Sequence, residues 1–247
     1  MAEDISTPEE VTETEEVTEE IAAEPTIALL FELENIGFQG RKVVFDVLKS
    51  VLADKDMKLE PVHFSRCCVD TPVETSLPAL LELLGHPRVS SEKLIPEILQ
   101  GIRASMVDNT PKVSAALVSL IQKAQAEGYA IGAVSNLDTE AADMLHAKLD
   151  VGEAEEGAIV ASESDTGTGD AQAWKGAARA LDALIPACVV LTSSSRAAHA
   201  AVAAGMRCVV IPDDYTSFQD FGGTDRILDS LDDNAVGEIM DILAVHP

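Results

Sequence analysis

The sequence has few aromatic residues and few basic residues. Phe, Trp and Tyr make up 4% of the 247 residues, whereas all hydrophobic residues together make up 47%. The core must therefore be built mainly from Ala, Val, Leu and Ile, which is typical of helices packed on a parallel sheet. The 17 Lys and Arg residues face 43 Asp and Glu residues, and the net charge is −26. Because this charge repels a phosphate backbone, we expect no nucleic-acid binding.

Membrane, secretory and metal-binding signals are missing as well. No apolar run reaches the roughly 18 residues that span a bilayer, and the acidic N-terminus resembles neither a secretory signal nor a basic transit peptide. The four cysteines and five histidines show no metal-ligand spacing. Cys188 and Cys208 lie in apolar runs, so we interpret them as reduced, small hydrophobic residues, which are typical of proteins in a reducing compartment. We therefore predict a cytoplasmic protein that has no membrane partner and no zinc site.

The N-terminal segment differs in composition from the rest of the chain. Residues 1–24 contain ten carboxylates and no Lys or Arg, and they have no apolar face. Like-charge repulsion and the lack of apolar surface to bury are typical of disordered segments. We predict a disordered acidic tail over residues 1–24 that solubilises the protein, in preference to a dedicated partner-binding arm.

The ordered part begins with one short apolar run and continues with helical periodicity. Residues 26–31 are apolar and are followed by Glu32, so they predict a buried strand with carboxylates at its carboxyl end. Residues 41–53, 74–84 and 91–106, together with a shorter stretch around 63–68, have the spacing of helices. No good strand occurs in 59–110. We therefore predict an all-helical unit over residues 38–108.

Helices and strands alternate in the second half. The pattern predicts strands at 129–134, 158–161, 187–191 and 207–211, and helices beginning at Pro111 and covering 139–149, 171–184, 196–204 and 234–243. Such alternation implies right-handed crossovers and a parallel sheet, which binds ligands beyond the carboxyl ends of its strands. In this chain those ends carry Glu32 and Glu34, Ser135 and Asn136, and the segment 192–195.

These residues resemble motifs of the haloacid dehalogenase (HAD) superfamily, specifically of its CbbY-like, β-phosphoglucomutase-like branch. In that branch the first strand ends in Phe-Asp-x-Asp-Gly, and here it reads Phe31-Glu32-Leu33-Glu34-Asn35. A second strand ends in Ser-Asn, here Ser135-Asn136. A later strand is followed by Glu-Asp-Ser and then Ala-Gly-Met, here Thr192-Ser193-Ser194 and Ala204-Gly205-Met206. The resemblance extends from about residue 27 to the C-terminus.

The resemblance implies a Rossmann-like α/β core over residues 25–37 and 109–247, with the helical unit 38–108 inserted as a cap. It also implies phosphoryl transfer through an Asp nucleophile, a second Asp as general acid/base, and Mg²⁺. The positions matching the catalytic pair are Glu32 and Glu34. Ser135 and Asn136 match phosphate-binding positions, and Glu32, Glu34 and Ser193 match metal-binding positions.

The chain departs from the family pattern at each acidic position. Glu32 and Glu34 are one methylene too long, Asn35 replaces Gly, and Ser193 replaces a charged metal ligand. The segment 166–170 replaces the family's Lys-Pro-x-Pro-Asp loop, and the nearest lysine, Lys175, lies about two turns late and is interpreted as a surface residue. Another candidate, Ser193–Ser195 with His199, lacks a Gly-x-Ser-x-Gly elbow and is better interpreted as a helix N-terminus.

We therefore predict a catalytically inactive HAD-like protein that binds a phosphorylated small molecule or a protein partner. The sequence does not distinguish between binding of a small molecule and binding of a protein. The alternative is an active sugar-phosphate phosphatase or phosphomutase with a weakened or relocated Mg²⁺ site.

Overall fold

A single parallel sheet forms the centre of the molecule. The computed structural model describes residues 26–149, 157–161 and 167–245. Its six strands lie in the order β3-β2-β1-β4-β5-β6, and every neighbouring pair is parallel. Their bounds are β1 Thr26–Glu32, β2 Ala130–Ser135, β3 Gly157–Ala161, β4 Ala183–Thr192, β5 Arg207–Val210 and β6 Arg226–Ile227. The predicted α/β class and the interior position of the strand at 27–31 are confirmed. The tail 1–24 lies outside the described residues.

Strand β1 is buried on both faces, which explains its continuous apolar sequence. Successive side chains of a strand point to opposite faces. Ala28 and Leu30 accordingly pack in the hydrophobic cluster on one side of the sheet, and Leu29 and Phe31 pack in the cluster on the other side.

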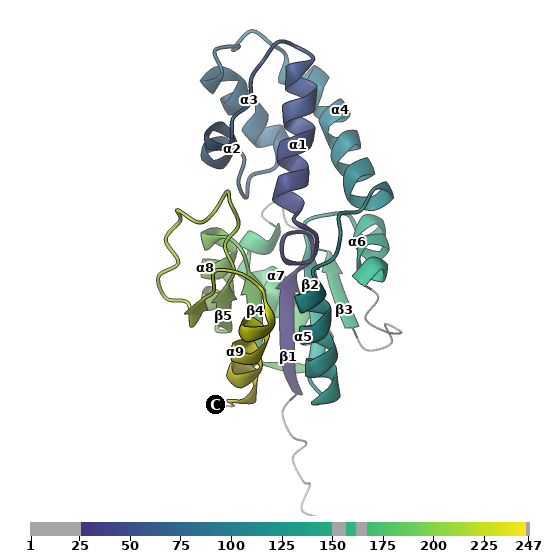
Figure 1. The fold of residues 1–247 in the computed structure, drawn as a ribbon, viewed down its shortest axis with the longest axis vertical. Coiled ribbons are helices and arrows are strands. Elements are labelled where there is room, and N and C mark those ends of the chain that lie inside the picture. The colour runs from purple at the N-terminus through teal and green to yellow at the C-terminus, as the bar shows by residue number, and fades with distance from the viewer. Residues whose placement is uncertain (1–25, 150–156, 162–166, 246–247) are drawn as a thin grey trace, which may run out of the picture.

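Helices cover both faces of the sheet (Figure 1). Helices α5 (Ala115–Ala126) and α9 (Asp233–Ala244) pack on the face of Leu29 and Phe31, whereas α7 (Ala171–Ala180) and α8 (Ser195–Ala204) pack on the opposite face. Helix α6 (Thr139–His146) contacts β3 at the edge of the described sheet. These helices leave the carboxyl ends of the strands free to form a site.

Four helices follow β1 and lie beyond the carboxyl ends of the strands (Figure 1). They are α1 (Gly40–Ala53), α2 (Pro61–Cys67), α3 (Val73–Leu83) and α4 (Ser91–Arg103). The fully described stretch 33–129 contains no strand, which confirms the helical periodicity seen in the sequence. The leucine and isoleucine stripes are buried as expected, at Leu77, Leu80, Leu94, Ile98 and Ile102. The exact division into core and cap at residues 38 and 108 stays a prediction.

The start of α5, the end of α7 and the start of β4 each differ by four residues from the sequence predictions, and one strand was not predicted. The helix expected at Pro111 begins at Ala115, because Ser114 caps it by accepting a hydrogen bond from the Leu117 N–H at 3.4 Å. The helix expected over 171–184 ends at Ala180, since the backbone of Asp182 turns with a φ of 51° and β4 begins directly afterwards. The two-residue strand β6 was not predicted, because so short a segment has no periodicity.

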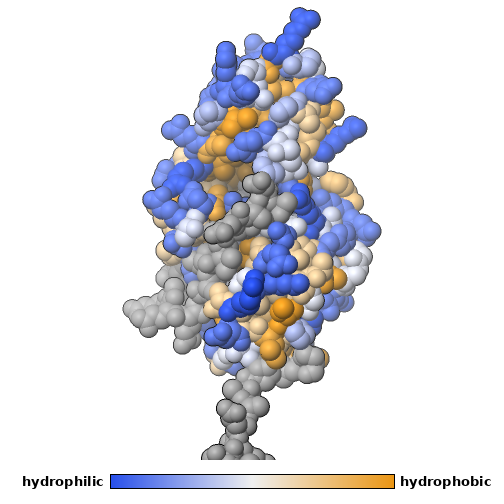
Figure 2. All heavy atoms as spheres, turned by 180° about the vertical axis from the view of Figure 1, so that it is seen from behind, coloured by the Kyte–Doolittle hydropathy of each residue, from blue (hydrophilic) through white to orange (hydrophobic). Residues whose placement is uncertain are grey.

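The surface agrees with the acidic, polar composition. Figure 2 shows hydrophilic side chains over much of the face seen from behind, with hydrophobic residues gathered mainly over the helical part and at the opposite end. Within the described ranges, none of the helices combines the length and the apolar character needed to cross a membrane.

Candidate functional site

The polar residues singled out in the sequence meet at the carboxyl ends of three neighbouring strands. Glu32 ends β1, Ser135 ends β2, and Ser193 directly follows β4. Because β1 lies between β2 and β4, these ends adjoin one another. All three side chains are buried, and so is Glu34, which lies in a π-helical turn (Leu33–Gly37) after β1. The fold thus brings together the residues that the sequence placed at one edge.

Both carboxylate oxygens of Glu32 are engaged. Oε2 accepts hydrogen bonds from the Ser193 N–H at 2.9 Å and from Ser193 Oγ at 2.5 Å, while Oε1 accepts one from Thr168 Oγ1 at 3.0 Å. Burial raises the pKa of Glu32, and the nearby Arg41 guanidinium opposes this shift without cancelling it. The Glu32 carboxylate is therefore held in place by three donors from two other segments.

Glu34 takes up the hydrogen-bond donors at the end of β2. Its Oε1 accepts from Ser135 Oγ at 2.6 Å, from the Asn136 N–H at 2.7 Å and from the Leu137 N–H at 3.1 Å. Its Oε2 is buried without a hydrogen-bond partner. Burial raises the pKa of Glu34, although each of these donors lowers it. Ser135, the first predicted phosphate-binding residue, is thus turned toward a carboxylate of the chain itself.

Asn136, the second predicted phosphate-binding residue, holds a turn of the chain. Its Oδ1 accepts a hydrogen bond from the Thr168 N–H at 2.9 Å. Thr168 belongs to the short 3₁₀ turn Gly167–Gly169, and its carbonyl accepts a hydrogen bond from Trp174 Nε1 at 2.9 Å. Asn136 and Trp174 therefore fix the turn that delivers Thr168 to Glu32. Phosphate binding by Ser135 and Asn136 stays a prediction.

A buried arginine that the sequence analysis missed completes the site. The Arg41 side chain donates from Nη1 to Ser193 Oγ at 2.7 Å and to Asp213 Oδ2 at 2.9 Å, and from Nη2 to Asp70 Oδ1 at 2.8 Å. Its Nη2 also lies 4.0 Å from Glu32 Oε1. Burial alone lowers the pKa of Arg41, but the carboxylates of Asp70, Glu32 and Asp213 outweigh it and raise that pKa above its ordinary value.

Helical spacing was the one signal that could have found Arg41. It shares a face of α1 with Phe45, Leu48 and Leu52, all of which are buried. A charged residue on the apolar face of a helix is buried only when it is paired. Asp70, Asp213 and Thr168 lie in loops and turns with no comparable pattern.

The residues present do not fit the Mg²⁺ ion that the family resemblance implies. Mg²⁺ requires oxygen ligands in a near-octahedral arrangement at about 2.0–2.1 Å. Glu32 is fully buried and accepts three hydrogen bonds, and the Ser193 hydroxyl donates to Glu32 while accepting from the Arg41 guanidinium, a cation in the place where Mg²⁺ would need an anionic ligand. No group of three or more His, Cys, Asp or Glu suited to a metal was found among the residues that the structure describes.

The remaining candidates behave as structural residues. Ser194 is the N-cap of α8 and accepts a hydrogen bond from the Ala197 N–H at 3.4 Å, whereas His199 is exposed on that helix. This confirms the interpretation of the serines as a helix N-terminus. Lys175 is half-buried on α7. Cys188 and Cys208 are buried free thiols, as expected for small hydrophobic residues.

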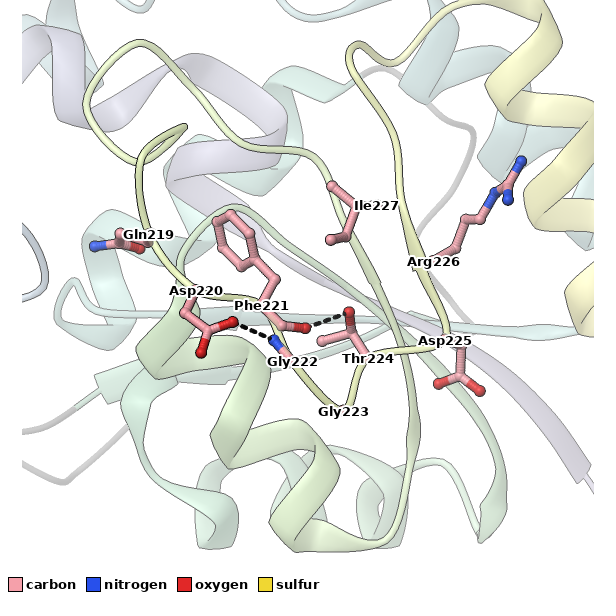
Figure 3. A pocket seen from close by; sticks show the side chains of 9 residues that line it. All are labelled: Gln219, Asp220, Phe221, Gly222, Gly223, Thr224, Asp225, Arg226 and Ile227. Atoms are coloured by element: carbon pink, nitrogen blue, oxygen red, sulfur yellow. Dashed lines mark hydrogen bonds between the residues drawn. The ribbon is translucent and has the colours of Figure 1, made fainter.

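A separate depression lies in the loop that follows β5 (Figure 3). It is lined by the consecutive residues 219–227. Asp220 Oδ1 accepts a hydrogen bond from the Gly222 N–H at 2.9 Å, and Thr224 Oγ1 donates to the Phe221 carbonyl at 2.8 Å. These polar groups stabilise the loop itself, so we assign no function to the depression.

The buried Glu34 carboxyl gives a prediction for stability against pH. Its raised pKa means that the folded state keeps this proton to a higher pH than the unfolded chain, in which a Glu pKa is about 4.3. The contribution of the Glu34 carboxyl to the free energy of unfolding is complete below the pKa of the unfolded chain, about 4.3, and is lost as the pH rises through the higher pKa of the folded state. Glu34→Gln cannot titrate, so relative to wild type its free energy of unfolding should rise with pH above 4.3, by at most about 1.4 kcal/mol per unit.

Urea unfolding of both proteins between pH 4 and pH 8 measures this difference. Gln keeps an oxygen for the three donors, and its NH₂ group replaces the unpartnered Oε2. The same substitution at the exposed Glu82 controls for the loss of one negative charge. A Glu34→Gln difference that is flat with pH, or that falls, contradicts the prediction.

Comparisons with known proteins agree with this architecture. The sequence matches no protein-family model and no curated protein. The structure is similar to CbbY from Rhodobacter sphaeroides in complex with xylulose-(1,5)bisphosphate, with a TM-score of 0.67 and 19% identity over 83% of this chain and 95% of that one. It is also similar to a β-phosphoglucomutase-like protein of Thermotoga maritima, with a TM-score of 0.67 and 13% identity over 88% and 100% of the two chains.

A HAD family hydrolase from Deinococcus radiodurans with bound phosphate and sodium has a TM-score of 0.69 and 19% identity, over 90% of this chain and 99% of that one. At such identities the likeness concerns the fold. These neighbours confirm the α/β fold with inserted helices that the resemblance implied. The chain shares that fold with the structures of CbbY, the β-phosphoglucomutase-like protein and the HAD family hydrolase.

Proposed function

We propose that this chain is a non-catalytic HAD-fold protein that acts as an interaction module. The observation that carries the proposal is the state of Glu32, which occupies the nucleophile position implied by the resemblance. Its carboxylate is fully buried and both oxygens accept hydrogen bonds, from Ser193 and Thr168. A nucleophile must direct a free lone pair at phosphorus in near-attack geometry, and an error of about 1 Å costs roughly a hundredfold in rate.

The acid/base position supports the same proposal. Glu34 would have to approach the leaving oxygen of a substrate, but its Oε1 is held by three donors at the end of β2. Ser193 contributes no charge where the resemblance places a metal-binding Asp. Phosphoryl transfer depends almost entirely on positioning and on stabilisation of the developing charge, so the combined changes remove most of the catalysis.

The same hydrogen bonds bear on what the protein binds. The CbbY structure contains a sugar bisphosphate and the Deinococcus radiodurans structure contains phosphate. In this chain, a phosphate at Ser135 and Asn136 would have to displace the Glu34 carboxylate from the Ser135 hydroxyl and the Asn136 N–H. This competition weakens the binding of a phosphorylated small molecule at these two residues, and the protein partner is the other role that the sequence leaves open.

We expect no Mg²⁺-dependent turnover of sugar phosphates by the wild-type protein. Over a panel of sugar mono- and bisphosphates, phosphate release should stay at the level of Glu32→Gln, with or without EDTA. The triple variant Glu32→Asp, Glu34→Asp, Ser193→Asp, which restores the family's side chains, is assayed in parallel as a comparator.

Turnover by the wild type that Glu32→Gln abolishes would overturn the proposal. If EDTA abolishes that turnover as well, the protein is the alternative, an active Mg²⁺-dependent sugar-phosphate phosphatase or phosphomutase. Turnover that survives in Glu32→Gln would instead indicate a contaminating phosphatase.

A further inference from the structure

The Arg41 guanidinium is surrounded by negatively charged groups from three separate segments. Asp70 lies between α2 and α3, Asp213 follows β5, and Glu32 ends β1. Arg41 Nη2 lies 2.8 Å from Asp70 Oδ1 and 4.0 Å from Glu32 Oε1, and Arg41 Nη1 lies 2.9 Å from Asp213 Oδ2. The Arg41 side chain is only 6% exposed, whereas that of Asp213 is 33% exposed, so water screens the Arg41 charge little and the Asp213 charge in part.

We propose that Arg41 is the permanent cation of this site: its guanidinium takes the place of the divalent metal ion, and the wild-type site therefore binds no divalent cation. Its Nη1 contacts Ser193 Oγ, at the position where the resemblance puts a charged metal ligand. The same Ser193 hydroxyl donates to Glu32, so Ser193 connects the Arg41 guanidinium to the Glu32 carboxylate through two hydrogen bonds. The inference goes beyond the proposed lack of catalysis, because it concerns what the site holds.

The fold positions the Asp213 carboxylate and the Asp70 backbone independently of the arginine. Asp213 Oδ1 accepts hydrogen bonds from the Tyr215 N–H at 2.8 Å and from Thr216 Oγ1 at 3.1 Å. The backbone carbonyl of Asp70 accepts a hydrogen bond from Arg196 Nη1 at 2.9 Å, which joins this loop to α8. Removal of Arg41 would therefore leave the Asp213 carboxylate in place, and the Asp70 side chain on an anchored backbone, without their counter-ion.

A cation could then enter the space that the guanidinium leaves. Carboxylate oxygens are the ligands that hard cations prefer. The fixed geometry of the Asp213 carboxylate reduces the ordering cost of binding. We expect Arg41→Gln to bind a hard cation at least about tenfold more tightly than wild type, since one like charge within about 4 Å is removed.

Terbium luminescence sensitised by tryptophan measures this binding at the right place. Trp174 is the only tryptophan in the chain, and it is joined to Glu32 through Thr168. Excitation at the red edge of the absorption band selects the indole over the two tyrosines, so the sensitised emission reports Tb³⁺ near Trp174. Competition with Mg²⁺ tests whether the divalent ion takes the same place.

Three proteins are compared as full chains. Wild type should show no sensitised emission at micromolar Tb³⁺, and Arg41→Gln should show emission that Mg²⁺ displaces. Arg103→Gln is the matched control: Arg103 also pairs with two carboxylates, Asp138 and Glu140, but it is exposed and lies outside the site. It should behave as wild type does.

The stability of the variant provides an independent measurement. Arg41→Gln should have a lower melting temperature than wild type, and Mg²⁺ should raise that temperature in the variant alone, because a ligand of the folded state shifts unfolding by mass action. A variant that is unfolded at the assay temperature should regain its circular dichroism when Mg²⁺ is added.

Two outcomes would overturn the inference. One is Mg²⁺-displaceable emission from the wild type, and the other is an Arg41→Gln protein that gains neither emission nor Mg²⁺-dependent stability. Both readouts are independent of turnover. A wild type that binds Mg²⁺ without turnover contradicts this inference alone, whereas EDTA-insensitive turnover that Glu32→Gln abolishes contradicts the proposed function alone.

Discussion

Replacing Trp174 by Ala should lower the free energy of unfolding by about 3–5 kcal/mol, the range for truncating a large aromatic side chain in a core. Trp174 is fully buried on α7, in a cluster composed largely of alanines. Such small neighbours cannot move far enough to fill the space of an indole. The loss should appear in urea unfolding followed by far-ultraviolet circular dichroism.

The indole also has a hydrogen bond that can be separated from its volume. Trp174 Nε1 donates to the Thr168 carbonyl, and Thr168 in turn reaches Glu32. Trp174→Phe keeps most of the ring and removes the donor, so it should cost less than Trp174→Ala. If Trp174→Ala stays within 1 kcal/mol of wild type, the described packing of α7 on the sheet is wrong.

Gly167→Ala should destabilise the protein by about 2–4 kcal/mol, since a left-handed backbone costs a non-glycine residue roughly 1–2 kcal/mol and a steric conflict adds to this. The φ of Gly167 is +53°, and a Cβ there would lie 1.7 Å from Asn136 Oδ1. Asn136 cannot move away freely, because that oxygen accepts the Thr168 N–H. The substitution should therefore also detach Thr168 from Glu32.

Gly169, two residues later, is the matched control. A Cβ on Gly169 would meet the side chain of Arg196, with 2.6 Å to Nε, and its φ lies outside the left-handed region. Arg196 is exposed and can shift, although this breaks its hydrogen bond to the Asp70 carbonyl, so Gly169→Ala should cost less than Gly167→Ala. Equal unfolding free energies for Gly167→Ala and Gly169→Ala would show that the turn is not constrained as described.

Local patterns in the sequence were sufficient for most of the secondary structure. The apolar run before Glu32 predicted β1, and helical spacing predicted α1, α3 and α4. Apart from the short strand β6, which was missed, the errors lie at ends of elements. The start of α5 depends on a cap at Ser114, and the end of α7 depends on the positive φ of Asp182, neither of which changes the apolar periodicity.

The sequence by itself also determined which carboxylates and hydroxyls share one edge. Parallel strands present their carboxyl ends on the same side, so Glu32, Ser135 and Ser193 had to lie near one another once the strands were recognised. It determined equally that Glu32 and Glu34 are longer than the family's aspartates and that Ser193 carries no charge, because these are properties of the side chains alone.

Only the tertiary structure decided what occupies the site. Arg41 is separated by 29 residues from Asp70, by 152 from Ser193 and by 172 from Asp213, and the three come from different loops. Periodicity describes neighbours one or two turns apart, so it carries no information about such partners. It could place Arg41 on the buried face of α1. Which charges meet it there follows from how the helices after β1 are packed over the sheet.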